Sequence, residues 1–446
     1  MNTTLLRTSI VAALGGFLFG FDTAVISGTT NQLRQVFNLS SFLLGLTVAS
    51  ALIGTVLGAI LSRKPSDFLG RRQSLIWIAM LYLVSALGSA FAWDWHSLLI
   101  FRFIGGLAVG GASMVSPLYI AEISPARVRG RLVAITQLNI VLGALIAFMS
   151  NYFVAQFELG AIEWRTMFGI EAVPAAVFFL LMLGAPSSPR WLVAQGRNSE
   201  AAVVLRSLGS ASVEQKVTLI EESLVLENRG TQEPLFQAVY KQPILLAIAI
   251  ATFNQLSGIN ALMYYAPQIF QMAGAESNSA LLQTISLGGT NLVFTTAALV
   301  MIDHLGRKKL MIAGSIGYIV SLAATATAFY KYGTNFDDLG STLVLVSLLV
   351  FCASHAFGQG AVIWVFLSEI FPNRVRARGQ ALGCFTHWFF ASVVSWTFPV
   401  IAEISGGHVF AFYSGMMILQ LVWVLKVMPE TKGVPLEEIQ KHLGIQ

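Results

Sequence analysis

The chain has 446 residues, of which 55% are hydrophobic and only 11% are charged, and its mean hydropathy is +0.71. A soluble domain carries about 25% charged residues, so this composition excludes a soluble enzyme or a soluble nucleic-acid-binding protein. The two cysteines, Cys352 and Cys384, both lie in apolar stretches and provide neither a disulfide framework nor a zinc site. The composition therefore predicts an integral membrane protein.

Twelve stretches of the chain are long and apolar enough to span a bilayer, which takes about 20 residues of helix. The expected fold is therefore an all-α membrane protein with twelve transmembrane helices. The first stretch lacks the pattern of a cleaved secretory signal and is expected to remain as a helix. The predicted spans are 9–29, 43–62, 74–92, 98–119, 132–153, 166–185, 243–264, 281–302, 309–330, 342–368, 380–402 and 408–428.

The basic residues predict the orientation. If both termini are cytoplasmic, 23 of the 27 Lys and Arg residues fall on the cytoplasmic side. The exceptions are Arg34, Arg165 and Lys331, which fall outside, and Arg102, which falls within a span. This bias is the one that the positive-inside rule describes. A miscounted helix would have destroyed it, because every later loop would change sides.

One stretch between spans, about 187–242, exceeds the length of a simple loop. It contains two amphipathic patterns, which predict short helices against the cytoplasmic face of the membrane rather than a separate domain. We therefore predict an N-terminal six-helix bundle at 1–186, a cytoplasmic linker at 187–242, a C-terminal six-helix bundle at 243–428 and a cytoplasmic tail at 429–446. The apolar residues of the two patterns are Ala201, Val204, Leu205 and Leu208, and then Val217, Ile220 and Leu224.

The two halves repeat each other. The sequence Asp67-Phe-Leu-Gly-Arg-Arg72 recurs as Asp303-His-Leu-Gly-Arg-Lys308. Likewise, Glu122-Ile-Ser-Pro-Ala-Arg-Val-Arg129 recurs as Glu369-Ile-Phe-Pro-Asn-Arg-Val-Arg376. Each pair follows the second or the fourth span of its own half. Two parallel, pseudo-symmetric halves are a transporter architecture, with the substrate site between them near the bilayer midplane.

Seven motifs in chain order resemble those of one family. They are Leu18-Phe-Gly-Phe-Asp-Thr-Ala-Val-Ile-Ser-Gly28, Arg102-Phe-Ile-Gly-Gly106, Pro117-Leu-Tyr-Ile-Ala-Glu-Ile-Ser-Pro125, Pro189-Arg-Trp-Leu192, Gln255-Leu-Ser-Gly-Ile-Asn-Ala-Leu-Met-Tyr-Tyr265, Leu367-Ser-Glu-Ile-Phe-Pro372 and Pro429-Glu-Thr-Lys-Gly433. Over almost its whole length the chain thus resembles the sugar porters of the major facilitator superfamily. The resemblance implies the major facilitator fold and alternating-access transport of a monosaccharide, either facilitated or driven by protons.

Three charged residues within spans are candidates for proton coupling. Asp22 lies in the middle of an apolar span, where an ionised carboxylate costs about 3 kcal/mol or more. Arg102 in the fourth span is the available cation, and in the family that the chain resembles the two positions face each other. Glu171 in the sixth span is a second carboxylate, and like Asp22 it matches the proton-coupled branch. The alternative is a structural ion pair between Asp22 and Arg102 whose protonation does not change.

A monosaccharide site needs carboxamides, which donate and accept hydrogen bonds without a net charge, and aromatic rings to cover the apolar face of the sugar. Ser257-Gly258 and Pro267 predict that the seventh span bends at this site. The alternative is that the amides and the two histidines only connect packed helices. The candidates are Gln137, Asn254, Gln255, Asn260, Asn291, His355, Trp364, His387 and Trp388, with Phe19 and Tyr264 at positions that line or close the cavity in relatives.

Several positions depart from the family's motifs. Asn254 stands where relatives usually have a second Gln, Ala361 replaces a Pro before Trp364, and Ala391 replaces an Asn. His355 stands where many glucose-type relatives have Phe, and it resembles the His of the animal fructose-type branch. These departures leave the identity of the sugar open.

A repeated set of charges marks the cytoplasmic ends of the spans. We expect these residues to form salt bridges between the two bundles that exist only when the cytoplasmic side is closed, which would stabilise the outward-open state. The alternative is a solvated basic surface. Asp67 and Asp303 match the family's loop motif at the same ends. The set consists of Arg71, Glu122, Arg129, Arg307, Glu369 and Arg376.

The sequence contains no phosphate-binding loop, no His-Glu-x-x-His and no nucleophile elbow, so neither ATP-driven transport nor an enzyme is expected. We predict a secondary active transporter that takes up a monosaccharide together with a proton and needs no cofactor or metal. We expect the monosaccharide to be a hexose. The expected partners are the sugar, the proton and the lipid bilayer, with no nucleic acid. We expect a monomer in a bacterial inner membrane. One alternative is a facilitative uniporter. A second is a sugar sensor that does not transport, but the short predicted tail, 429–446, argues against it.

Overall fold

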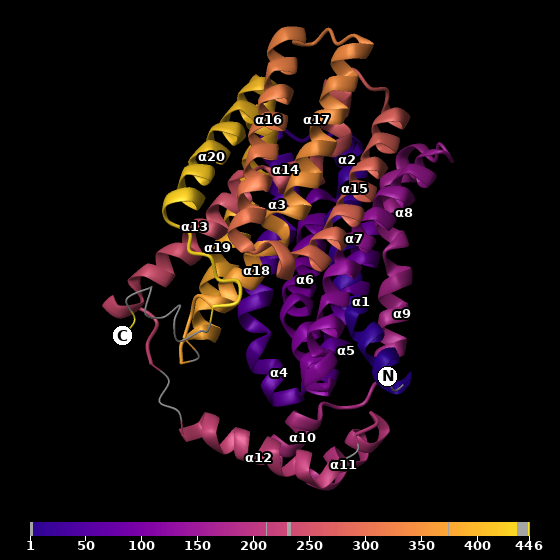
Figure 1. Cartoon of the computed structure of the whole chain (residues 1–446). Helices are drawn as coiled ribbons and strands as arrows, with labels where there is room; N and C mark the ends of the chain where they lie inside the picture. Colours follow the sequence, from indigo (N-terminus) through magenta and orange to yellow (C-terminus); the bar gives the residue numbers. More distant parts are fainter. Residues whose placement is uncertain (1–2, 211, 230–232, 373, 435–444, 446) are drawn as a thin grey trace. The chain divides into compact units, whose positions relative to one another are not determined.

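The structure, a computed structural model, describes residues 3–210, 212–229, 233–372, 374–434 and 445, with the side chains of 126, 226–229 and 303 left out. Within these residues the chain forms only helices joined by turns and short loops (Figure 1). Twelve helical segments of the described chain are long and apolar enough to cross a membrane. The predicted number of spans is therefore confirmed.

The chain divides into two compact units. The first consists of Met1–Thr23, Ile53–Ala147 and Arg165–Thr231. The second consists of Ala24–Leu52, Phe148–Trp164 and Gln232–Gln446. The second unit thus includes the end of the first span, the beginning of the second, the end of the fifth and the beginning of the sixth, whose remainder belongs to the first unit. The predicted bundles, 1–186 and 243–428, are each continuous in sequence, unlike these units, and they stay a prediction.

Two helices of the first unit, α6 and α10, begin at residues whose side chains cap them. The Asp94 side chain accepts from the backbone N–H of Ser97 at 2.7 Å and closes a capping box at the start of α6. Ser188 caps α10, and Pro189 occupies its first turn. The helices of this unit are α1 (Thr3–Val25), α4 (Arg63–Leu69), α5 (Arg71–Ala90), α6 (Trp95–Ile123), α7 (Ala126–Ala155), α8 (Glu163–Ile170), α9 (Ala172–Leu183), α10 (Pro189–Ala194), α11 (Asn198–Ser207) and α12 (Val213–Arg229), with the later part of α3 (Ser41–Leu61).

A single apolar core holds α1, α5, α6 and α9 together, and Leu18, Tyr82, Tyr119 and Phe178 belong to it. Small residues let α3 approach α6 closely. A Cβ on Gly110 would lie 2.2 Å from the carbonyl oxygen of Thr55, which no larger residue could accept.

The two amphipathic patterns of the long connecting segment do form helices, α11 and α12. Leu192 and Ala201 are the centre of a small apolar cluster among α10, α11 and α12, and Val217 and Ile220 pack against it. Leu208, just after α11, belongs to the main core of the first unit. The axis of α12 runs across the direction of α5 and α6 (Figure 1). These helices are therefore part of the first unit.

Two spans of the second unit are interrupted. Gly258 has φ 86° and ψ 11° between α13 and α14, which confirms the bend predicted in the seventh span. A Cβ at this position would lie 2.4 Å from the Tyr413 ring, so only glycine fits. Gly358 separates α17 from α18 in the tenth span. The helices are η1 (Ile26–Gly28), α2 (Thr30–Val36), the first part of α3, η2 (Gly160–Ile162), η3 (Ala238–Tyr240), α13 (Lys241–Leu256), α14 (Ile259–Met272), α15 (Ser277–Leu305), α16 (Arg307–Tyr332), α17 (Asp338–Phe357), α18 (Gln359–Glu369), α19 (Arg376–Ile404) and α20 (Gly406–Lys426).

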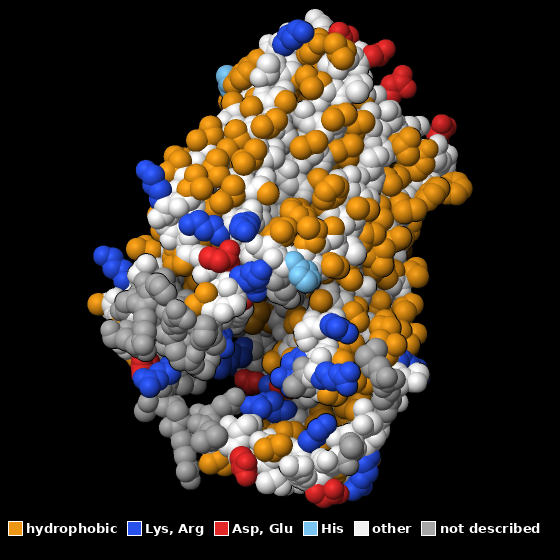
Figure 2. All heavy atoms as spheres, in the orientation of Figure 1, with side chains coloured by type: hydrophobic (Ala, Val, Ile, Leu, Met, Phe, Trp, Pro, Cys, Tyr) orange, Lys and Arg blue, Asp and Glu red, His pale blue; other side chains and the backbone are white. Residues whose placement is uncertain are grey.

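The outer face of the second unit is apolar along the spans. Hydrophobic side chains cover α15, α16, α17 and α20, whereas Lys and Arg gather near the lower end of α20 (Figure 2). Val300 and Val320 are 67% and 63% exposed, which suits contact with lipid rather than with water. The chain is thus a multi-pass membrane protein.

Candidate functional site

Asp22 on α1 and Arg102 on α6 are in contact inside the first unit. Nη1 of Arg102 lies 2.5 Å from Oδ1 of Asp22, and its Nη2 lies 3.5 Å from the backbone oxygen of the same residue. The two residues are 2% and 1% exposed. The guanidinium carbon lies 5.4 Å from the ring centroid of Phe168, a cation–π distance. The structure thus brings these two predicted proton-coupling residues together as a buried ion pair.

Glu171 adds a second carboxyl to this pair. It is 1% exposed and interacts electrostatically with both Asp22 and Arg102. Its position follows from a break in the sixth span, because Pro174 has no N–H to donate to the carbonyl of Ile170, the last residue of α8. Oε1 of Glu171 and Nε of Arg102 have no hydrogen-bond partner among the described residues. Two carboxyls therefore lie within electrostatic range of one guanidinium, and Asp22 is the one that is hydrogen-bonded to it.

Two residues of α5 that the sequence reasoning missed complete this cluster. The hydroxyls of Tyr82 and Ser85 are buried and have no hydrogen-bond partner in the described part of the chain. Tyr82 interacts electrostatically with both Asp22 and Glu171. A Cβ on Gly105 would lie 2.4 Å from Oγ of Ser85 and 3.3 Å from Oδ1 of Asp22, so this glycine makes room for both side chains. We call the group Asp22, Tyr82, Ser85, Arg102 and Glu171 the charged cluster.

The second unit gathers amides instead of charges. The Asn260 amide donates to Oε1 of Gln255 at 2.8 Å, and the Gln255 amide donates to Oδ1 of Asn254 at 3.0 Å. The Gln255 nitrogen also lies 3.1 Å from Nε2 of His387 on α19. Gln255 lies in the last turn of α13 and Asn260 in the first turn of α14, so the left-handed turn at Gly258 is what brings the two amides together.

Aromatic rings adjoin these amides. The ring centroids of Trp364 and His387 are 5.0 Å apart, and those of His387 and Trp388 are 4.8 Å apart. Trp364 and Asn260 are only partly buried, so both keep surface on which a ligand can bind. We call Asn254, Gln255, Asn260, Trp364, His387 and Trp388 the amide cluster.

His355 and Asn291, which were also predicted to bind the sugar, have hydrogen-bond partners outside the amide cluster. His355 contacts the Tyr318 hydroxyl at 2.6 Å, and that hydroxyl lies 3.1 Å from Oε1 of Gln359. Asn291 accepts from the Thr295 hydroxyl at 3.2 Å. Tyr264 is buried on α14. The remaining two belong to the first unit, where both are half-buried, namely Phe19 on α1 and Gln137 on α7.

The charged set at the predicted cytoplasmic ends forms one ion pair inside each unit. In the first unit, Nε of Arg71 lies 3.0 Å from Oε1 of Glu122, and the Ser188 hydroxyl donates to Oε2 at 2.5 Å. Asp67 also lies 3.2 Å from Arg71. Arg129 donates to the carbonyl of Ser124 at 3.4 Å.

The second unit repeats this arrangement. Arg307 contacts both oxygens of Glu369, at 2.8 and 3.2 Å, and the Thr431 hydroxyl donates to Oε2 at 2.5 Å. Arg376 donates to the carbonyl of Phe371 at 3.3 Å. The side chain of Asp303 lies outside the described residues. The expected salt bridges between the two bundles therefore stay a prediction.

Glu430, beyond the last span, caps α16. Its carboxylate accepts from the backbone N–H groups of Arg307, Lys308, Thr431 and Lys432, each at 3.0 Å. Partial burial acts to raise the pKa of Glu430, but these four hydrogen bonds outweigh it and lower the pKa below its usual value. Among the described residues no group of three His, Cys, Asp or Glu side chains is arranged to hold a metal ion.

Comparison with known proteins agrees with this geometry. Residues 8–443 match the family described as "Sugar (and other) transporter". The chain is 38% identical to the D-xylose-proton symporter of Escherichia coli K12, covering 98% of this chain and 96% of that protein. It is 36% identical to the arabinose-proton symporter of Bacillus subtilis strain 168, covering 97% and 94%.

Solved structures are similar as well. An inward-open structure of the Escherichia coli xylose transporter matches with a TM-score of 0.87 and 37% identity, covering 98% of this chain and 99% of that one. A structure of the same transporter bound to 6-bromo-6-deoxy-D-glucose matches with a TM-score of 0.79, covering 99% of both chains.

Proposed function

The chain belongs to the sugar transporter family of the major facilitator superfamily, and from this premise we propose that it takes up a monosaccharide together with a proton by alternating access. It is a transporter and not an enzyme. The observation that carries the proposal is that the charged cluster contains two carboxyl groups but only one cationic group, the guanidinium of Arg102.

The charged cluster supplies the proton site. Arg102 can balance only one ionised carboxylate, and a second one would be an uncompensated charge inside the membrane. Asp22 holds the guanidinium in this structure. When Asp22 takes up the transported proton, its hold on Arg102 weakens and Glu171 becomes the competing partner. Tyr82 and Ser85, whose hydroxyls lack partners among the described residues, can relay the proton to Asp22 by taking up one proton as they give up their own.

The amide cluster supplies the sugar site. Its carboxamides donate and accept hydrogen bonds without a net charge, which matches the hydroxyls of a monosaccharide. The chain of hydrogen bonds from Asn260 through Gln255 to Asn254 fixes each amide before the sugar arrives, which lowers the entropy lost on binding. Trp364, which is only partly buried, offers a ring face to the apolar side of the sugar.

The two named symporters act on pentoses and another relative is a "Glucose transport protein" of Synechocystis sp., so xylose is the first sugar to test beside the expected hexose. We place the protein in the inner membrane of a bacterial cell, as a monomer with both termini in the cytoplasm. The distribution of basic residues supports this orientation.

Uptake into proteoliposomes tests the proposal. We would measure the internal concentration of labelled xylose, arabinose, glucose, fructose and galactose, with and without an imposed gradient that is acidic outside. A symporter concentrates its sugar above the external level only with the gradient. Equilibration that ignores the gradient would show the facilitative uniporter instead. Binding without any flux would show the sugar sensor.

A further inference from the structure

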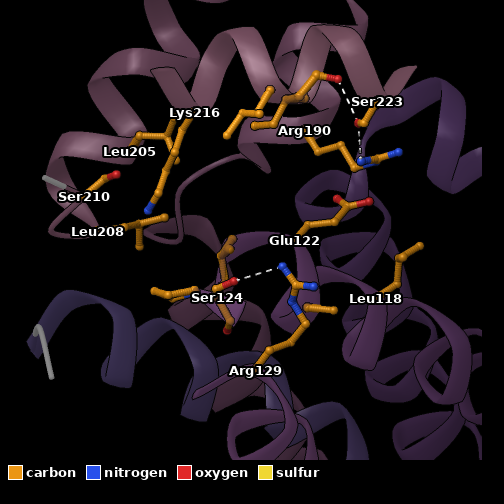
Figure 3. A pocket seen from close by; sticks show the side chains of 15 residues that line it. Leu118, Glu122, Ser124, Arg129, Arg190, Leu205, Leu208, Ser210, Lys216 and Ser223 are labelled. Carbon is orange, nitrogen blue, oxygen red and sulfur yellow. Dashed lines mark hydrogen bonds between the residues drawn. The ribbon is translucent and has the colours of Figure 1, made fainter. Parts of the chain in front are cut away.

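A cavity of about 500 Å³ lies in the first unit where α6 ends and α7 begins (Figure 3). The opposite wall comes from α12 and from the loop after α11. None of the proton-coupling or sugar-binding residues lines this space. Its volume is within the range of about 300–1,000 Å³ that is typical of small-molecule sites.

Cationic side chains enter the cavity from opposite sides. Lys216 reaches down from α12 and Arg129 reaches up from α7 toward the space between them (Figure 3). No carboxylate of the described chain pairs with either of them, and Arg129 contacts only the Ser124 carbonyl, at 3.4 Å. Arg190, which also lines the cavity, donates to the Ser223 hydroxyl at 3.1 Å.

Two hydroxyls in the wall have no partner. Oγ of Ser124 and Oγ of Ser210 are buried without a hydrogen bond to any described residue, and Ser124 is only 5% exposed. A buried hydroxyl without a partner destabilises a fold, because its hydrogen bonds to water are lost and not replaced. Neither oxygen is exposed to the cavity in this structure, so a ligand in the cavity meets the cations and not these hydroxyls.

The single carboxylate of the wall does not cancel the positive charge. Both oxygens of Glu122 are already engaged, one by Arg71 at 3.0 Å and the other by the Ser188 hydroxyl at 2.5 Å. The lining therefore carries a net positive charge. Its remaining surface includes Leu205 and Leu208, which favour an uncharged organic group beside the anion.

We propose that this cavity is a binding site for an organic phosphate. The phosphate oxygens accept hydrogen bonds from Arg129 and Lys216, and the organic part lies against the leucines. A phosphate suits this site better than a carboxylate because it offers acceptors in several directions to donors that converge from opposite walls. The same group can come from a soluble phosphate ester or from the headgroup of a membrane lipid.

Titration of the purified full chain with phenyl phosphate tests the soluble source. We expect saturable binding by calorimetry and a higher unfolding temperature, whereas phenol, which lacks the phosphate, has no effect. Lys216→Ala should weaken the affinity about tenfold, because it removes a charge-assisted hydrogen bond. Lys64→Ala, at an exposed lysine outside the cavity in the same unit, should leave the affinity unchanged.

Nanodiscs of phosphatidylcholine with and without phosphatidic acid test the lipid source. If only phosphatidic acid raises the unfolding temperature, and Lys216→Ala removes the effect, the ligand is a lipid headgroup and the site stands. The proposal is overturned if neither phenyl phosphate nor phosphatidic acid binds. It is equally overturned if both Lys216→Ala and Arg129→Ala bind these ligands as well as the unchanged chain does.

Discussion

The charged cluster of the first unit and the amide cluster of the second differ in charge and in how completely their polar groups are hydrogen-bonded. The charged cluster contains two carboxyls and one guanidinium, and several of its polar atoms have no hydrogen-bond partner among the residues that the structure describes. The amide cluster contains only neutral groups, and its hydrogen bonds form a continuous chain. A site that must gain and lose a proton has to tolerate two charge states. A site that must recognise hydroxyls needs donors and acceptors in fixed places.

The strongest way to break this comparison is to remove the single cation. Arg102→Ala leaves Asp22 and Glu171 as buried carboxyls without a positive partner, so we expect the free energy of unfolding to fall by about 3–5 kcal/mol. Thermal unfolding in detergent measures this loss. Adding Asp22→Asn to Arg102→Ala should restore part of the stability, because one of the two carboxyls is then gone. An unchanged unfolding temperature for Arg102→Ala would mean that the two buried carboxyls do not need Arg102 for stability.

Removal of the central amide should act on binding instead. Gln255→Ala deletes one sugar contact and leaves the amides of Asn254 and Asn260 unfixed, so we expect sugar affinity to fall about thirtyfold, equivalent to roughly 2 kcal/mol. Binding calorimetry with the transported sugar gives the change. Gln283→Ala is the matched control, because Gln283 bonds only to Ser279 on its own helix. Equal losses for the two variants would contradict the assignment of the amide cluster.

The amide cluster also depends on a backbone break. Gly258→Ala places a Cβ at φ 86° and 2.4 Å from the Tyr413 ring. We expect a loss of about 1–2 kcal/mol in the free energy of unfolding, since a left-handed conformation disfavours any residue with a side chain. Gly415→Ala in α20, where a Cβ meets nothing within 4 Å, should cause no such loss. The account of the bend fails if the two variants unfold alike.

Glu430, whose carboxylate accepts four hydrogen bonds, provides a comparison for Glu171, one oxygen of which has no partner among the described residues. The pKa of Glu430 is lowered in the folded chain, so its contribution is present above the usual pKa of glutamate and is lost as pH falls through the lowered value. Because Glu430 is exposed, we expect the contribution to be only about 0.5 kcal/mol. Unfolding temperatures of Glu430→Gln and the unchanged chain should therefore differ at neutral pH and converge in acid. A constant difference across this range would contradict the expectation.

Periodicity and composition predict most of the fold, because spans of this length must be apolar and α11 and α12 each have one apolar face. The break at Gly258 was predictable from its Ser-Gly and Pro signals. The break at Glu171 carried a signal that the sequence analysis did not use, namely Pro174 placed four residues after Ile170. The interruption at Gly358 had no distinctive signal, since the chain has 39 glycines.

The residues of the candidate site were only partly predictable. Asp22, Arg102 and Glu171 stand out because a charge within an apolar span is rare. Tyr82, Ser85 and Ser89 recur on one face of α5, which is a helical pattern of hydroxyls that sequence alone could have flagged. That two of these hydroxyls lie beside buried carboxyls depends on packing against α1 and on the space left by Gly105, which no local pattern encodes.

The most direct test of proton coupling through Asp22 is to record external pH when the transported sugar is added to de-energised cells that produce the protein. The unchanged chain should carry protons inward with the sugar and make the weakly buffered medium more alkaline. Asp22→Asn should still exchange labelled sugar across the membrane but should cause no change in pH. An alkaline shift of the same size in Asp22→Asn would contradict the account.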